Sequence, residues 1–132
     1  MTTTDQKTEE GLVKAINRLI QPSEDFGIKD LESIYHQDMV VVMLDENNQK
    51  VVFRKEAFMQ LIAAKLEEEG GKSNTWAQFL HTEVQQDQGH IIVKRRIDLL
   101  HQKSELTVIL DFVWEDDRWQ ITRETIFSQP LK

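Results

Sequence analysis

Two arginines lie in apolar segments of the second half of the chain, and they are the residues best suited to bind a ligand. Arg95 falls within residues 90–101 and Arg123 within residues 118–127. Both segments alternate apolar and polar residues, and every second side chain of a strand lies on the same face. The alternation predicts that both guanidinium groups lie on an apolar sheet face, on either side of Leu110. A buried guanidinium needs an anion or several acceptors, because leaving it unpaired is costly.

This arginine pair has two interpretations. In the first, each arginine forms a structural ion pair with a helix carboxylate such as Asp30, Asp38 or Glu56. In the second, both point into an internal pocket and bind the carboxylate or phosphate of a small ligand, which suits the planar arginine fork. The other side chains expected to line such a pocket are Tyr35, Trp76, Trp114 and Thr82.

Two further residues are candidates for acid–base chemistry. Asp111 lies in an apolar run, and His81 lies two residues from Glu83. A histidine near carboxylates, or a carboxyl group in apolar surroundings, can act as a general acid or base. Alternation instead puts both on the opposite, mixed face of the sheet. There Asp111 would pair with Lys94 across strands, and His81 would join a polar cluster with Arg96.

Sequence motifs for metal, phosphate or nucleophile chemistry are absent. The four histidines have no metal-ligand spacing, and the chain contains neither a glycine-rich phosphate loop nor a Gly-x-Ser-x-Gly motif. The lack of cysteine excludes disulfides, thiolate zinc sites and thiol catalysis. We therefore predict no metal and no cofactor.

Composition narrows the class of protein. The chain has 132 residues, of which 39% are hydrophobic and 30% charged, as is typical of one globular domain. The net charge of −7 argues against general binding to nucleic acid or anionic membranes, since both need a basic surface. No signal peptide or bilayer-spanning apolar run is present. We expect a cytoplasmic protein with a flexible tail over residues 1–10 and a single domain over 11–132.

The order of elements predicts an α+β fold. Helical spacing occurs over residues 12–20, 28–35 and 55–69, and a strand hairpin over 39–53 separates the second and third helices. Four alternating segments follow, over residues 76–85, 90–101, 105–114 and 118–127. Turn signals join them at residues 87–89, 102–104 and 116–117. Helices followed by such an antiparallel meander are typical of the α+β class.

Two stretches add a family resemblance. Residues 30–39 (DLESIYHQDM) and 112–121 (FVWEDDRWQI), with the order of elements, resemble the NTF2-like or cystatin-like cone superfamily, including SnoaL-like proteins. The resemblance covers nearly the whole chain after about residue 10. It implies a strongly curved antiparallel sheet wrapped around three helices from the N-terminal half, forming a cone with an internal pocket. Kinase association domains of this superfamily have arginines lining that cavity, and ketosteroid isomerases hold a protonated acid in a strand similar to that of Asp111.

Three functions stay open at this point. The first is binding of a small anionic or carboxylate ligand in an apolar pocket that contains both arginines. The alternative is a lyase or isomerase of the SnoaL or ketosteroid isomerase type that uses Asp111 or His81. The second alternative is an interaction or assembly domain without a ligand. The resemblance also implies a homodimer through the outer sheet face, with an apolar centre formed by Ile92, Ile109, Val113 and Ile126.

Overall fold

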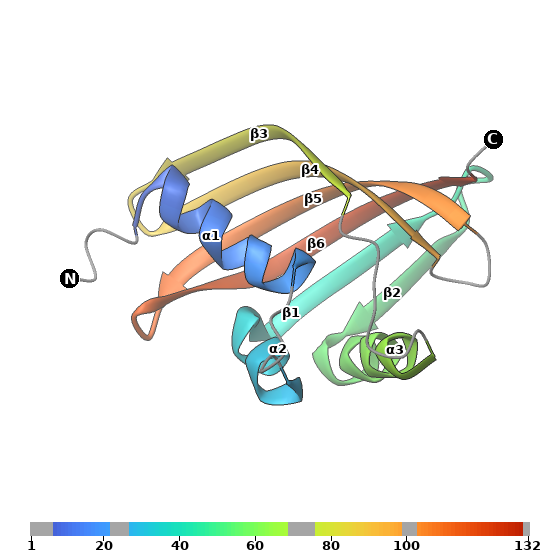
Figure 1. The fold of residues 1–132 in the computed structure, drawn as a ribbon, viewed down its shortest axis with the longest axis horizontal. Coiled ribbons are helices and arrows are strands. Elements are labelled where there is room, and N and C mark those ends of the chain that lie inside the picture. The colour runs from blue at the N-terminus through green and yellow to red at the C-terminus, as the bar shows by residue number, and fades with distance from the viewer. Residues whose placement is uncertain (1–6, 22–26, 69–75, 99–102, 131–132) are drawn as a thin grey trace.

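The computed structural model describes residues 7–21, 27–68, 76–98 and 103–130, and it confirms the α+β class. The helices are α1 (Glu9–Ile20), α2 (Ile28–Ile34) and α3 (Lys55–Glu68). The strands are β1 (Tyr35–Leu44), β2 (Lys50–Arg54), β3 (Ala77–Gln85), β4 (Gln88–Asp98), β5 (Lys103–Glu115) and β6 (Arg118–Pro130). Figure 1 shows the long strands lying side by side above the helices.

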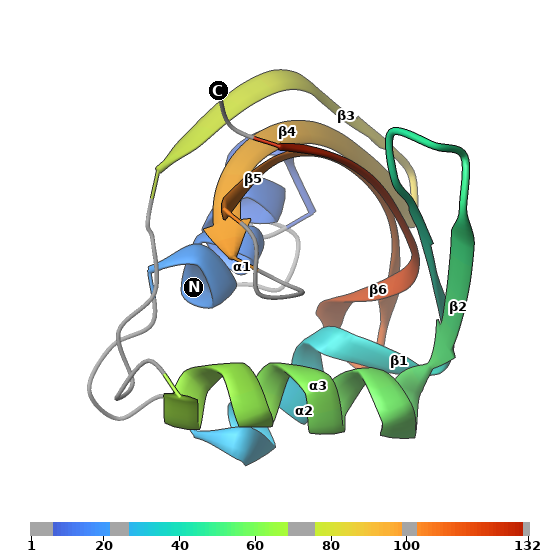
Figure 2. The same ribbon diagram turned by 90° about the vertical axis from the view of Figure 1, so that its right-hand side faces the viewer.

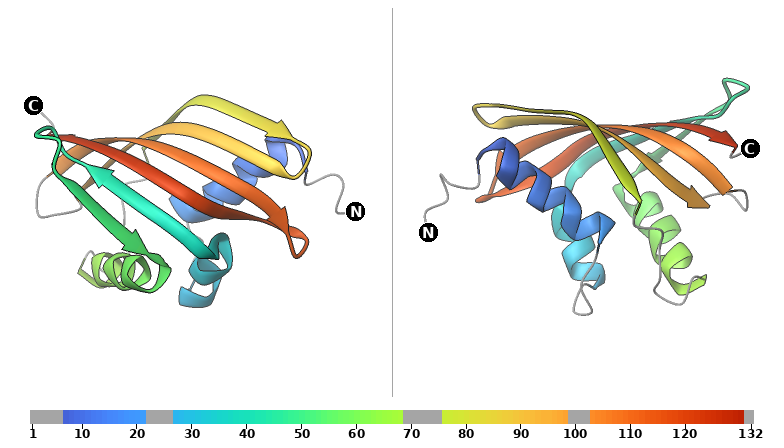
Figure 3. Two further views of the ribbon diagram at one scale, coloured as in Figure 1. Left: turned by 180° about the vertical axis from the view of Figure 1, so that it is seen from behind. Right: turned by 45° about the horizontal axis from the view of Figure 1, so that its top comes forward.

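The strands form one curved sheet in the order β2-β1-β6-β5-β4-β3. Strands β3 to β6 are the predicted antiparallel meander, whereas β1 adds to the edge of β6 in parallel. Seen along the sheet, the strands arch over the helices without closing into a barrel (Figure 2). Within the described residues no helix covers the convex face, which we call the outer face (Figure 3).

Helix α1 packs directly on the concave face of the sheet. Thr8 caps its N-terminus, with the Thr8 hydroxyl accepting from the Gly11 amide at 3.0 Å, so the helix begins before the expected boundary at residue 11. A side chain in place of the Gly89 hydrogen would lie within 2.9 Å of Leu12. Gly89 therefore lets the helix approach strand β4 closely. The buried stripe of α1 comprises Leu12, Ile16 and Ile20, as the spacing predicts.

Helix α2 passes straight into the sheet. Its first turn is held by Asp30, whose side chain accepts from the Gly27 amide at 2.9 Å. At the other end the Lys55 ammonium donates to the carbonyls of Glu32 and Tyr35, both at 2.8 Å, and so satisfies the last helical carbonyls. Strand β1 starts at Tyr35 rather than at residue 39, because the chain extends without an intervening loop. Tyr35 consequently enters the core from the start of a strand.

The faces of β4 and β5 agree with the prediction, although the pairing register does not. The turn signal at residues 87–89 implied a two-residue turn at 88–89, whereas the first turn lies at residues 86–87. The connection at 99–102 lies outside the described residues. Moving a turn by two residues leaves the facing of every side chain unchanged, since the strand period is two. It does change the partners. Arg95 pairs with Leu106, and Leu110 pairs with Ile91 and Glu124, so the expected position of Leu110 between two arginines is wrong.

A β-bulge in β6 reverses the predicted facing of the rest of that strand. Phe112 pairs with Ile121 and Asp111 pairs with Arg123, so Thr122 is an extra residue on β6. Beyond it, Glu124 is buried and Arg123 is exposed. The prediction that Arg123 lies in the pocket is therefore wrong. Ile126 is also buried, at 2% exposure, so its assignment to an outer dimer interface is wrong for the same reason.

A second bulge changes β3. Phe79 pairs with Val93 and His81 pairs with Ile92, which leaves Leu80 as the extra residue, exposed at 49%. Phe79 faces the core instead of Leu80, contrary to the alternation in the sequence. Strand residues after the bulge return to their expected faces, so Thr82 points inward opposite Ile91 as predicted.

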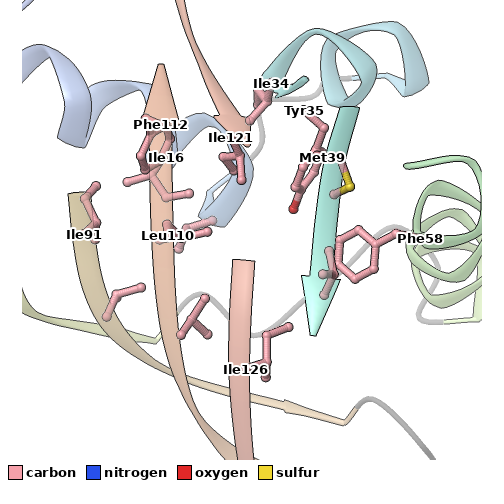
Figure 4. Close-up of a cluster of buried hydrophobic side chains, with 14 of the residues drawn as sticks. Ile16, Ile34, Tyr35, Met39, Phe58, Ile91, Leu110, Phe112, Ile121 and Ile126 are labelled. Carbon is pink, nitrogen blue, oxygen red and sulfur yellow. The ribbon is translucent and has the colours of Figure 1, made fainter. Parts of the chain in front are cut away.

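The core lies between the helices and the concave face. Figure 4 shows side chains from all three helices and from the sheet in one cluster, among them Ile16, Ile34 and Phe58. The rings of Tyr35 and Phe58 also meet edge to face there, with their centroids 5.5 Å apart and their planes at 76°. None of the described helices combines the length and the apolar character needed to cross a membrane.

Candidate functional site

The concave face contains a buried pair of polar side chains. The Tyr35 hydroxyl donates to a Glu124 carboxylate oxygen at 3.1 Å. Tyr35 is 2% exposed and Glu124 is 7% exposed. Strand β1 supplies the tyrosine and strand β6 the glutamate, and the parallel pairing of these strands brings the two together. In Figure 4 the Tyr35 hydroxyl points into the apolar cluster.

Arg95 is the third buried polar residue of this region and lies on β4, on the same concave face. It is 9% exposed, and its Nε donates to the Trp76 carbonyl at 3.2 Å. The guanidinium interacts electrostatically with Glu124 and with Tyr35. A sheet carboxylate, Glu124, therefore lies within electrostatic range of Arg95, and neither interpretation of the sequence named it. We call Tyr35, Arg95 and Glu124 the interior site.

Burial governs the ionisation of the interior site. Burial raises the pKa of Glu124 from 4.5 to about 7, while the Tyr35 hydrogen bond and the charge of Arg95 act in the opposite direction. Burial also raises the pKa of Tyr35 well above its usual value, and the charge of Glu124 adds to this. The pKa of Arg95 is lowered by burial. Near neutral pH, Glu124 thus exists in both protonation states, beside a neutral phenol and a cation.

Such an arrangement is typical of functional sites. A carboxyl group with a strongly shifted pKa, in apolar surroundings and beside a specific charge, can accept or release a proton near pH 7. With the proton it is a hydrogen-bond donor, and without the proton it is an acceptor only. The interior site can therefore bind an anion, or transfer a proton to a bound molecule.

Sequence reasoning missed Glu124 because it assumed a regular strand. The apolar residues Ile121 and Ile126 lie five positions apart, an odd spacing that a regular strand cannot place on one face. Both are buried, at 0% and 2% exposure. The bulge between them buries both in the same core, and it brings Glu124 inside.

The two acid–base candidates lie on the outer face, as alternation predicts. Asp111 Oδ1 and His90 Nδ1 form a hydrogen bond at 2.7 Å, so the expected pairing of Asp111 with Lys94 is wrong. Lys94 pairs instead with Glu105, at 3.3 Å. His81 contacts Glu83 at 3.2 Å. Neither Asp111 nor His81 can act on a molecule inside the cone, so a lyase or isomerase mechanism there would need other residues.

One of the outer-face histidines, His90, lines a hollow, and His81 lies near its ring. The rings of His81 and His90 lie 6.1 Å apart, and a hollow of about 540 Å³ is lined by Glu83, His90 and Asp111 among others. In the part of the chain that the structure describes, no three histidine or carboxylate side chains are placed to hold a metal ion.

The remaining predicted ligand-binding residues are dispersed. The ring of Trp76 packs on the guanidinium of Arg96, 4.1 Å from the ring centroid, and so lies away from the concave face. Trp114 lines a hollow near the end of the β5–β6 hairpin. Of the proposed dimer residues, the half-buried Ile92, Ile109 and Val113 lie on the outer face, and a homodimer through them stays a prediction.

Comparisons with known proteins show the fold. No protein-family model and no curated protein matches the sequence. Several solved structures do match. An NTF2-like protein of unknown function from Silicibacter pomeroyi superposes with a TM-score of 0.70 and 16% identity, over 97% of this chain and 99% of that one. An NTF2-like protein from Shewanella baltica, also of unknown function, superposes with a TM-score of 0.66 and 7% identity, over 99% of both chains.

A third match is an NTF2-like protein from Cytophaga hutchinsonii, with a TM-score of 0.66 and 12% identity over 92% of this chain and 98% of that one. The chain therefore has the NTF2-like fold, as the resemblance in sequence implied. At these identities the likeness establishes the architecture alone, because one fold carries many functions.

Proposed function

We propose that this protein binds a small, largely apolar molecule with one anionic group inside its cone, with Arg95 as the binding cation. The observation that supports this most directly is the Glu124 carboxyl group, buried beside Tyr35 and within electrostatic reach of Arg95. Purely structural polar groups are expensive to bury, and apolar side chains of similar size usually replace them at no loss of stability. Their presence on an otherwise apolar face favours a role in binding.

Charge determines which ligand suits the site. Arg95 is the buried cation of the concave face, and its guanidinium is suited to a ligand carboxylate or phosphate. A second negative charge beside Glu124 raises the pKa of that group further, since like charges disfavour each other. An anionic ligand is thus expected to bind together with a proton, and the protonated Glu124 can then donate a hydrogen bond to it.

A thermal-shift screen of small carboxylates and phosphates at pH 6 tests this proposal. Ligands that stabilise the wild-type protein are expected to have no effect on Arg95→Met, which keeps a long apolar side chain but lacks the charge. A ligand at a hundred times its Kd adds about 2.7 kcal/mol to the stability of the folded state. Arg123→Ala is the matched control, because this exposed arginine lies on the other face. Equal stabilisation of Arg95→Met and wild type would contradict the proposal.

The dependence of affinity on pH provides a second test, which leaves Arg95 in place. Above the Glu124 pKa of about 7, binding must take up a proton, so the Kd is expected to rise about tenfold for each pH unit. The Glu124→Gln variant carries no titrating proton there and should bind with a nearly constant Kd. Wild-type affinity that is flat between pH 6 and 8.5 would refute the coupling.

A further inference from the structure

A second hollow, of about 420 Å³, lies between α1, α2 and the β5–β6 hairpin. The three elements meet at one end of the molecule (Figure 1). The hollow combines two indoles with several cations, and its charged and aromatic side chains are Glu10, Lys14, Arg18, Trp114, Arg118 and Trp119. We call it the tryptophan hollow. Tyr35, Arg95 and Glu124 are not among its lining residues, so it is separate from the interior site.

The two tryptophans form its aromatic wall. Trp114 and Trp119 face each other across the hairpin, with ring centroids 5.3 Å apart and planes at 79°. Trp119 is buried at 5% exposure and is anchored in the core, whereas Trp114 is half-buried. An indole corner of this kind offers a rigid apolar surface for a flat ring, with little side-chain entropy left to lose on binding.

Cations from two elements surround that wall. Lys14 and Arg18 lie one helical turn apart on α1, and Arg118 extends from the start of β6. The Arg118 Nε donates to the Ser33 carbonyl at 3.0 Å, which fixes the direction of the guanidinium. The two terminal nitrogens of the Arg118 guanidinium carry four further N–H donors. A cluster of three cations is unexpected on a chain whose net charge is −7.

The two cations of α1 have acid partners only at exposed positions. Lys14 Nζ lies 3.9 Å from Glu10 Oε1, and the two side chains are 78% and 84% exposed. An Arg18 terminal nitrogen lies 3.3 Å from Asp30 Oδ1, and these two side chains are 55% and 40% exposed. Exposed ion pairs of this kind contribute little to stability and are readily exchanged for a better partner. A phosphate, which accepts bidentate hydrogen bonds from guanidinium groups, is such a partner.

We propose that the tryptophan hollow binds a small molecule in which a flat ring carries a phosphate group. The ring packs against Trp114 and Trp119, and the phosphate lies among Lys14, Arg18 and Arg118. The hollow has the size of typical small-molecule sites, which range from about 300 to 1,000 Å³. A phosphate is favoured over a single carboxylate because its double negative charge suits three cations.

Isothermal titration calorimetry with adenosine monophosphate tests the proposal, since the two halves of this probe are available separately. The nucleotide is expected to bind at least about tenfold more tightly than adenosine or inorganic phosphate alone, because one ring contact and one charged contact are combined. The double variant Lys14→Ala, Arg118→Ala should weaken nucleotide binding at least tenfold and leave adenosine binding unchanged. Trp114→Leu should weaken the binding of both.

Matched controls separate this site from general electrostatics and from the interior site. Lys50→Ala, Arg54→Ala removes two exposed cations from β2 and should leave the nucleotide Kd within twofold of wild type. Arg95→Met should leave it unchanged as well, so the two proposals can fail independently. Three outcomes would overturn the inference. They are no binding heat at millimolar nucleotide, a nucleotide affinity equal to that of phosphate, and equal losses in the β2 and hollow variants.

Discussion

The ionisation of Glu124 depends on two opposing effects of its surroundings. Loss of water favours the neutral acid, whereas the Tyr35 hydroxyl and the Arg95 charge favour the carboxylate. The first effect prevails and the pKa rises to about 7. Tyr35 itself remains a neutral donor at every physiological pH, because its own pKa is raised. The interior site therefore has one titrating proton near neutrality, and that proton is on Glu124.

This shift predicts how the stability of the protein changes with pH. The folded-state pKa of Glu124 is higher than the unfolded value of 4.5, so the folded protein binds this proton more tightly. Its contribution to stability is complete below pH 4.5 and is lost as the pH rises through about 7. Each pKa unit corresponds to about 1.4 kcal/mol, so the loss amounts to about 3 kcal/mol. Urea unfolding at several pH values measures it.

The neutral variant Glu124→Gln isolates this contribution from other titrating groups. The stability of wild type relative to this variant should fall steadily from pH 4.5 to about 7.5 and then level off. Arg123→Ala, one residue away and exposed, should follow the wild-type curve within about 0.5 kcal/mol, as surface substitutions usually do. A difference between wild type and Glu124→Gln that does not vary with pH would show that Glu124 titrates normally.

At the scale of elements, two bulges decide which side chains reach the interior. The predicted pairing register was displaced by two residues at a turn. The faces of β4 and β5 were still correct, because two residues are one full period of side-chain alternation in a strand. A single extra residue at Thr122 reversed every later assignment on β6, including Arg123 and Glu124. The helices were easier to predict, since Leu12, Ile16 and Ile20 each contribute to one continuous stripe.

The bulge in β3 provides a paired test of this account. Phe79 packs against the core, whereas its neighbour Leu80 is exposed at 49%. Phe79→Ser should lower the free energy of unfolding by about 2 kcal/mol, because a partly buried ring is lost. Leu80→Ser should change it by less than about 0.5 kcal/mol. A regular strand would give the reverse order, so chemical denaturation of the two variants distinguishes the two structures of β3.

At the scale of the whole molecule, the order of helices and strands predicted the α+β class, and the family resemblance implied a curved sheet over three helices. The parallel pairing of β1 with β6 was not visible in the sequence, because it joins segments more than 75 positions apart through no shared turn. That pairing places Tyr35 beside Glu124 and so creates the interior site. The fold was therefore predictable from local patterns, whereas the site depends on one long-range pairing and one bulge.

The interior site depends most on Glu124 being a buried acid that titrates near neutrality. Nuclear magnetic resonance of the side-chain carboxyl carbons, from pH 3 to 9, measures this directly, and the Glu124→Gln variant assigns the signal. We expect one glutamate to titrate with a midpoint near 7. If Glu124 instead titrates near its ordinary value of 4.5, the carboxyl group is in water and the proposed interior site is wrong.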